Sequence, residues 1–198
     1  MSMLDSIFGF VGKDFVICAA DSTNARSVVV MKDDLDKIKV LDDHKILAMA
    51  GEVNSIADLS EYVQKNVMLY SLRTSISLST AAVANFMRGV IAKAIRSRGG
   101  AFQTNMILAG YDEADGPSVY FLDYLGTLHK LNYTAQGLAP LFVMSTMDRH
   151  WKEGMDVDEA IQLVKMCISE VRKRVLVQQF KYTVKIVDKD GIRVLDVE

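Results

Sequence analysis

Strand-like and helix-like segments alternate in blocks along this 198-residue chain. A block of strand patterns comes first and a pair of helix patterns follows. More strands, a second helix pair and two final strands complete the chain. Because most strands arrive as hairpins, the sheets should be largely antiparallel, and the βαβ alternation of a doubly wound fold is absent. Each helix pair can cover one face of a sheet. The sequence therefore predicts an α+β fold, a four-layer α-β-β-α sandwich.

The strand segments are short runs rich in β-branched and aromatic residues, bounded by turn residues. Tight turns should follow the first strand at Gly12 to Asp14 and precede the last at Asp190-Gly191. The expected strands are residues 7–11, 15–20, 27–31, 37–41, 45–50, 104–110, 118–123, 127–131, 182–187 and 192–197.

Four segments carry apolar residues at helical spacing. Two of them begin with pairs at capping-box spacing, Ser55 with Asp58 and Asp156 with Glu159. Gly99-Gly100 should end the second helix. The expected helices begin near residues 55, 79, 140 and 156 and end near residues 70, 98, 147 and 173.

The chain has no obvious division into parts. It contains only two prolines, Pro117 and Pro140, and no Gly/Ser linker, low-complexity tract or internal repeat. We therefore expect one domain over residues 1–198. Half of the residues are hydrophobic. A large core and an apolar surface for subunit contacts would each explain this fraction, and the sequence leaves both open.

Charge and hydropathy argue against two classes of partner. The net charge of -2 provides no general basic field for nucleic acid. A basic cluster, Arg88, Lys93, Arg96 and Arg98, lies late on a predicted helix and is better explained as a solvated face. No apolar run reaches membrane length, and the N-terminal residues do not form a signal-peptide pattern. We expect an intracellular, soluble protein.

Cofactor and metal motifs are also missing. The histidines His44, His129 and His150 show no ligand spacing, and the chain has no glycine-rich phosphate loop and no G-x-S-x-G elbow. Cys18 and Cys167 each lie in an apolar pattern and should be buried free thiols in a reducing compartment. No metal and no organic cofactor are expected.

The informative motif lies in the N-terminal strand block. Residues 5–10, a turn and residues 16–22 are followed by Lys37 and Ala50-Gly51. These segments and their spacing, with the pair Asp21-Ser22, resemble the proteasome β-type subunit family. Residues 61–67, 109–113, 123–125 and 187–191 resemble the branch of that family at the fourth β position, so the resemblance covers essentially the whole chain. The α-type subunits match less well, because they carry an extra N-terminal helix and a Tyr-Asp-Arg signature.

The resemblance implies an N-terminal-nucleophile hydrolase fold without its nucleophile. Active members begin with a threonine whose free α-amino group can act as the base; a lysine lowers the pKa of the nucleophile, and a glycine amide stabilises the oxyanion. The family spacing places Asp5 at the nucleophile position. The segment 174–180 offers neither the Asp nor the Ser of active relatives. The resemblance thus implies a non-catalytic subunit in which Asp21, Lys37 and Gly51 are relics, with a salt bridge as the remaining use of Asp21 and Lys37.

Two alternatives stay open. In an active threonine- or serine-type peptidase, removal of Met1 would expose Ser2, or further processing would expose Ser6. Ser2 lies about 10 Å of strand before the matched position, and a shift of one residue turns Ser6 to the opposite face of its strand. The other alternative is an unrelated four-layer binding protein that works alone.

The resemblance also implies partners and a location. The chain would join other proteasome α- and β-type subunits in stacked heteroheptameric rings in the cytoplasm and nucleus. Unfolded, mostly ubiquitin-tagged proteins would be degraded in the chamber of that assembly. Apolar residues on the surface should mark the subunit interfaces. The candidates are Tyr62, Met68, Leu69 and Tyr70, and a second group at Met144, Met147 and Trp151.

Overall fold

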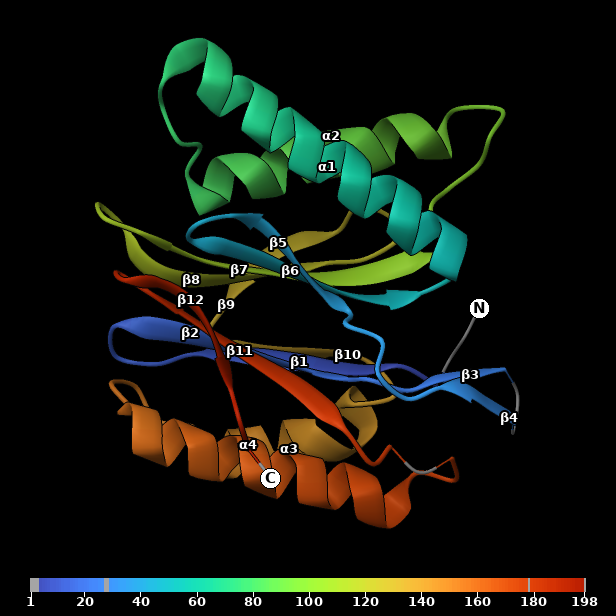
Figure 1. The fold of residues 1–198 in the computed structure, drawn as a ribbon, viewed down its shortest axis with the longest axis vertical. Coiled ribbons are helices and arrows are strands. Elements are labelled where there is room, and N and C mark those ends of the chain that lie inside the picture. The colour runs from blue at the N-terminus through green and yellow to red at the C-terminus, as the bar shows by residue number, and fades with distance from the viewer. Residues whose placement is uncertain (1–3, 27–28, 178, 198) are drawn as a thin grey trace.

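The first sheet contains the first and the last strand of the chain. The computed structural model describes residues 4–26, 29–177 and 179–197. Five antiparallel strands pair in the order β10-β1-β2-β11-β12, so β2 is central (Figure 1). Their bounds are Ser6–Val11 for β1, Phe15–Asp21 for β2, Tyr133–Gly137 for β10, Tyr182–Asp188 for β11 and Gly191–Leu195 for β12.

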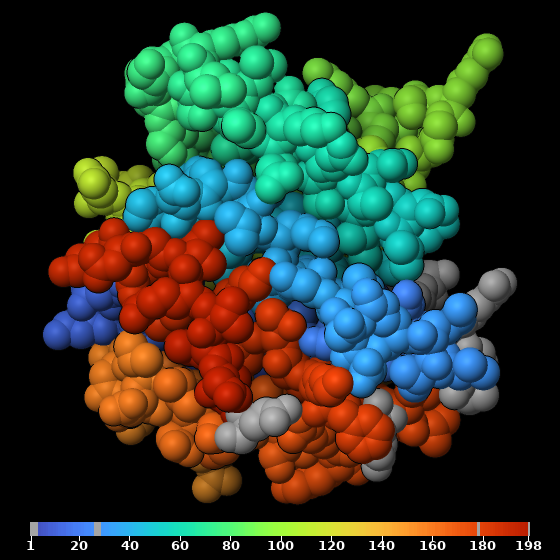
Figure 2. Space-filling model, in the orientation of Figure 1, coloured from blue at the N-terminus to red at the C-terminus, as the bar shows by residue number. Residues whose placement is uncertain are grey.

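The second sheet is an antiparallel meander of strands β5-β6-β7-β8-β9. Its strands are Ile38–Asp42, Lys45–Gly51, Thr104–Asp112, Gly116–Leu122 and Leu128–Leu131. A separate two-stranded hairpin, β3 (Asn24–Arg26) and β4 (Val29–Lys32), precedes it and projects from one end of the molecule (Figure 2).

Two helix pairs cover the outer faces of the sheets (Figure 1). Helices α1 (Val53–Thr74) and α2 (Thr80–Ile95) lie over the second sheet, and α3 (Pro140–His150) and α4 (Val157–Arg174) lie over the first. The predicted four-layer α-β-β-α sandwich is therefore confirmed.

Three apolar clusters hold the layers together. One lies between the sheets and includes Ile7, Cys18 and Ile46. The other two lie between each sheet and its own helix pair. Along β2, Ile17 packs toward α3 and α4 whereas Cys18 packs between the sheets, as the two-residue period of a strand requires. Every residue of β2 is buried because both faces of the sheet are covered.

The helix starts test the capping predictions. Asp156 and Glu159 form the predicted capping box at the start of α4, and the side chain of Ser79 caps α2 by accepting a bond from the Ala82 N–H. The capping box predicted at Ser55 and Asp58 is wrong. Helix α1 begins earlier, at Val53, with Glu52 at its N-cap, and the Ser55 hydroxyl donates to the Glu52 carboxylate instead.

Some predicted boundaries are also wrong. Helix α2 ends at Ile95, before the Gly99-Gly100 pair, and α3 continues to His150. The strand β10 has no counterpart among the predicted strands. Residues 27 and 28 of the strand predicted at 27–31 lie outside the described residues.

The burial predictions have mixed outcomes. Cys18 and Cys167 are buried and free, as predicted, and burial raises the pKa of each thiol to about 12. Tyr62, Met68, Leu69 and Tyr70 are exposed. Met147 is fully buried, so this interface candidate is wrong, whereas Met144 and Trp151 are half-buried and pack against the core between the first sheet and α3–α4. Among the described residues, no helix is long and apolar enough to span a membrane.

Candidate functional site

The beginning of β1 is held from three directions. Asp5 directly precedes β1, which pairs with β10 on one side and β2 on the other. The Leu138 N–H donates to the Asp5 carbonyl at 2.8 Å. The Gln179 side-chain amide donates to the Leu4 carbonyl at 2.5 Å, and the Tyr182 hydroxyl donates in turn to Gln179 at 2.6 Å. These contacts fix the position of the Asp5 backbone, from which its side chain extends.

Lys37 enters the site from the segment before β5. Its ammonium contacts Asp5 Oδ1 at 2.6 Å, Asp21 Oδ2 at 2.9 Å and the Thr23 carbonyl at 2.7 Å. These three acceptors match the three N–H bonds of the ammonium. The lysine side chain is only 4% exposed, so the three contacts replace the water that it would otherwise bind.

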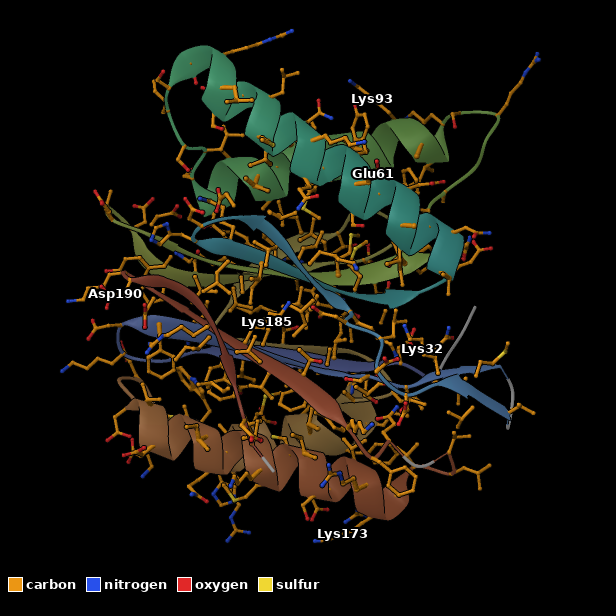
Figure 3. The ribbon with its side chains drawn as sticks, viewed as in Figure 1. Lys32, Glu61, Lys93, Lys173, Lys185 and Asp190 are labelled. Carbon is orange, nitrogen blue, oxygen red and sulfur yellow. The ribbon has the colours of Figure 1, made fainter. Side chains whose placement is uncertain are left out.

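The segment that carries Lys37 is anchored by a second buried lysine. The Lys185 ammonium, from β11, contacts Asp36 Oδ2 and the Ile38 carbonyl, each at 2.6 Å. In Figure 3 Lys185 lies between the two sheets. The residues on either side of Lys37 are therefore tied to the first sheet, and this positions the Lys37 side chain.

The remaining oxygens of the two carboxylates bind backbone amides. Asp5 Oδ2 accepts from the Gly51 N–H at 2.9 Å, at the end of β6. Asp21 Oδ1 accepts from the Ser6 N–H at 2.7 Å, and Asp21 Oδ2 also accepts from the Thr23 N–H at 3.1 Å. Asp5, Asp21, Lys37 and Gly51, far apart in the sequence, thus belong to one buried network.

The network holds two carboxylates against one ammonium in a dry environment. Burial raises the pKa of Asp21 to about 6, although the Lys37 ammonium and the Ser6 N–H act in the opposite direction. Proximity to the Asp5 carboxylate raises it further. Charge repulsion between the carboxylates and their removal from water thus both favour a proton on Asp21.

This raised pKa predicts a pH dependence of stability. Between about pH 4 and pH 6 the folded chain holds a proton on Asp21 that the unfolded chain has released, and this difference in proton binding stabilises the folded state. The stabilisation is complete below about pH 4 and is lost as the pH rises through about 6. We expect the free energy of unfolding of wild type to fall by about 1–3 kcal/mol more between pH 4 and pH 7 than that of Asp21→Asn. Urea unfolding of the two purified chains across this range measures the difference, and parallel pH curves would contradict it.

A wide groove opens beside the network. Its volume is about 1040 Å³, and it runs between the β3–β4 hairpin and the first turns of α1. Asp5, Lys37 and Gly51 form part of its wall, with Met31, Val53 and Ile56 among the apolar residues around them. The network is therefore next to a space that could hold an extended chain.

Ser6, the described serine of the active-peptidase alternative, lies on another face of β1. Ser6 is fully buried and begins β1, where Phe8 packs toward α3 and α4 and Ile7 packs between the sheets. By strand alternation the Ser6 side chain belongs to the face of Phe8, away from Lys37. Ser2 is outside the described residues. Two other participants, the Thr23 carbonyl and the Gln179 side chain, have no signal in the sequence.

Comparison with known proteins identifies the family of the chain. The model of the family described as "Proteasome subunit" matches residues 4–187. The chain belongs to this family. It is 47% identical over 190 residues to proteasome subunit beta type-2-A of Arabidopsis thaliana, a match that covers 96% of this chain and 92% of the relative. These findings confirm the resemblance to the β-type branch of the family.

Two more distant relatives extend the comparison. The chain is 44% identical to proteasome subunit beta type-2 of Dictyostelium discoideum over 195 residues, covering 97% of each protein. It is 39% identical to proteasome subunit beta type-4 of Saccharomyces cerevisiae over 194 residues, covering 98% of each. The similarity therefore runs through both sheets and both helix pairs.

Metal binding has no support in the described part of the chain, where no group of three or more His, Cys, Asp or Glu side chains could hold an ion. The charges of the network are balanced by Lys37 and by backbone amides instead.

Proposed function

We propose that this chain is a non-catalytic subunit of the β ring of the 20S proteasome core. The observation that supports this most strongly is the position of Asp5. Its carboxylate contacts the Lys37 ammonium at 2.6 Å, and within the described residues no hydroxyl or thiol does so. A peptidase of this family needs a nucleophile that can form an ester or thioester with the substrate and then be released by water.

The contacts of Asp5 occupy the groups that catalysis would use. In active relatives the lysine lowers the pKa of the nucleophile. Here the same lysine forms ion pairs with two carboxylates. In active relatives the glycine amide points at the developing oxyanion. Here the Gly51 N–H donates to Asp5 Oδ2 at 2.9 Å. A carbonyl oxygen that approached Gly51 from the groove would have to displace this carboxylate.

The loop after α4 supports the same reading. Gln179 lies in the segment where active relatives have an Asp and a Ser, and its amide binds the Leu4 carbonyl. The backbone directly before Asp5 is thus held in place by a hydrogen bond from Gln179. An α-amino base would require the chain to begin at that point.

In this proposal the chain serves the assembly through its surfaces. It assembles with other α- and β-type subunits into stacked heteroheptameric rings, in the cytoplasm and the nucleus. It supports the ubiquitin-dependent degradation of unfolded proteins by catalytic neighbours. The whole chain, residues 1–198, acts as one domain of the ring.

The proposal predicts that the chain forms no adduct with an inhibitor. A peptide epoxyketone or vinyl sulfone, applied to particles purified from cells, should label catalytic neighbours and leave this chain unmodified, because Asp5 cannot supply the attacking hydroxyl. Mass spectrometry of the N-terminal peptide should find it starting at Met1 or at blocked Ser2. The labelled neighbours are the internal control. An adduct at Ser2 or Ser6, or a free processed N-terminus at either serine, would support the active peptidase instead.

A further inference from the structure

A cavity of about 570 Å³ lies between α4 and the end of the chain. Ile168 of α4, Tyr182 at the start of β11 and Leu195 at the end of β12 form its apolar part. Strand β12 is the edge of the first sheet, and in Figure 1 the segment after it passes in front of α4. The cavity therefore has one wall from a helix and one from a sheet edge, and it shares no lining residue with the groove beside Asp5.

One face of α4 brings polar and basic side chains to this cavity. The residues of α4 that line it with such side chains are Lys165, Ser169, Arg172 and Lys173. Counted from the first of them, spacings of four, seven and eight residues place them on one face of the helix. The helix dipole favours basic residues in the last turn of α4, where Arg172 and Lys173 lie, but Lys165 lies about two turns earlier. The helix end alone therefore does not account for this basic face.

Arg172 is held in place by uncharged partners. Its Nε donates to the Gln179 carbonyl at 3.4 Å, and its Nη2 donates to the Phe180 carbonyl. Carbonyl oxygens orient the guanidinium but carry no negative charge to offset it. Among the described residues, the other terminal nitrogen, Nη1, has no hydrogen-bond acceptor. The guanidinium thus has a fixed orientation, with donors left for a group in the cavity.

The charges around the cavity do not cancel. Lys173 pairs with Glu170 at 3.2 Å, whereas Lys165 and Arg172 form no ion pair with any described carboxylate. Asp196, on the C-terminal wall, is the acidic residue of the lining. Lys165 and Arg172 therefore supply two positive charges without a paired carboxylate, on a chain whose net charge is -2.

We propose that this cavity binds a small organic phosphate through Lys165 and Arg172. The two unpaired cations match a phosphate dianion, and a guanidinium fork fits its oxygens. The half-buried Ser169 can donate a further hydrogen bond from its hydroxyl. The apolar part of the ligand packs on Ile168 and Leu195. The volume, about 570 Å³, lies in the usual range of ligand pockets.

The first test compares probes that carry one or both parts of such a ligand. Phenyl phosphate joins a phosphoryl group to an apolar ring, inorganic phosphate lacks the ring, and benzyl alcohol lacks the charge. Phenyl phosphate should bind to the purified full-length chain at least about 10-fold more tightly than either of the others, because both the cations and the apolar wall then contribute. Isothermal titration calorimetry measures the three affinities.

Two substitutions with opposite effects locate the phosphoryl group. Lys165→Gln should weaken phenyl phosphate binding by about 10-fold, because it removes one cation from the wall. Asp196→Asn should strengthen binding by about 3-fold, because it removes the carboxylate that opposes the anion. Lys152→Gln, at an exposed position outside the cavity, is the matched control and should bind like wild type. Thermal unfolding without ligand shows whether each chain folds, and if one of the two does not, the other decides the outcome.

Three results would overturn the inference. The absence of binding at about 10 mM phenyl phosphate would reject the site. Equal affinities of wild type, Lys165→Gln and Asp196→Asn would mean that the probe binds elsewhere. Benzoate bound as tightly as phenyl phosphate would reject the phosphate assignment in favour of a carboxylate. None of these results bears on the proposed function, which is tested separately by inhibitor labelling of assembled particles.

Discussion

Lys37→Met should lower the free energy of unfolding by about 3–5 kcal/mol, because it leaves two buried carboxylates without their counter-charge. Asp5 and Asp21 both contact the Lys37 ammonium, at 2.6 and 2.9 Å, and their side chains are at most 10% exposed. Methionine keeps most of the length of the lysine side chain, so the change tests the charge more than the packing. Urea unfolding of the purified chain measures the loss.

Two further variants make this result specific. Lys39→Met, at an exposed position of β5, should stay within about 0.5 kcal/mol of wild type. Adding Asp5→Asn and Asp21→Asn to Lys37→Met should restore much of the stability, since the uncompensated charges are then gone. A Lys37→Met chain as stable as wild type would show that the network contributes little to the free energy of unfolding.

The Lys37 variant also separates structure from catalysis. In particles that do assemble with Lys37→Met, the peptidase activity per particle should match wild type, because in the proposed function this lysine has no nucleophile to activate. Loss of one peptidase activity in fully assembled particles would contradict the non-catalytic proposal.

Gly137→Ala should destabilise the chain by about 4 kcal/mol or more, at the large end of single-substitution effects. Gly137 ends β10 at φ +75°, and a Cβ there would meet the Asp5 carbonyl oxygen at 2.0 Å. The backbone of either β10 or Asp5 must then move, which also displaces the Asp5 carboxylate from the Gly51 N–H.

Gly154→Ala is the matched control for this clash. Gly154 has nearly the same backbone angle, φ +76°, but a Cβ there meets no atom within 4 Å. Its cost should be the left-handed strain alone, about 1–2 kcal/mol. Thermal or urea unfolding of the two variants compares them directly. Equal losses would mean that the approach of Gly137 to Asp5 is not tight in solution.

The sequence predicted the parts of the fold that have a local signal. The runs before Asp21 and Gly51 are apolar because β2 and β6 are covered on both faces, so their positions could be predicted from composition. The residues of the network could be selected because their spacing follows the resemblance to a known family. Their actual contacts required the structure, since the spacing does not say which carboxylate meets which amide.

The missed features depend on distant parts of the chain. Strand β10, with the sequence YTAQG, has little apolar alternation, and its pairing with β1 makes it a strand. The Thr23 carbonyl and the Gln179 amide contribute through hydrogen bonds that leave no periodic pattern. At α1 the capping spacing of Ser55 and Asp58 is present, but the helix begins at Val53, where the Glu52 carbonyl accepts from the Ile56 N–H and the Glu52 N–H donates to the Gln103 carbonyl.

The central position of β2 has a consequence for synthesis of the chain. One of its two neighbours, β11, runs from Tyr182 to Asp188, and the amide that holds the Leu4 carbonyl belongs to Gln179. A nascent chain therefore exposes an unpaired edge of β2 until β11 has left the ribosome. Contacts this distant in sequence slow folding. We expect the first sheet to close only after β11 and β12 have emerged from the ribosome, so that a chaperone which protects strand edges would act on this subunit before any neighbour does.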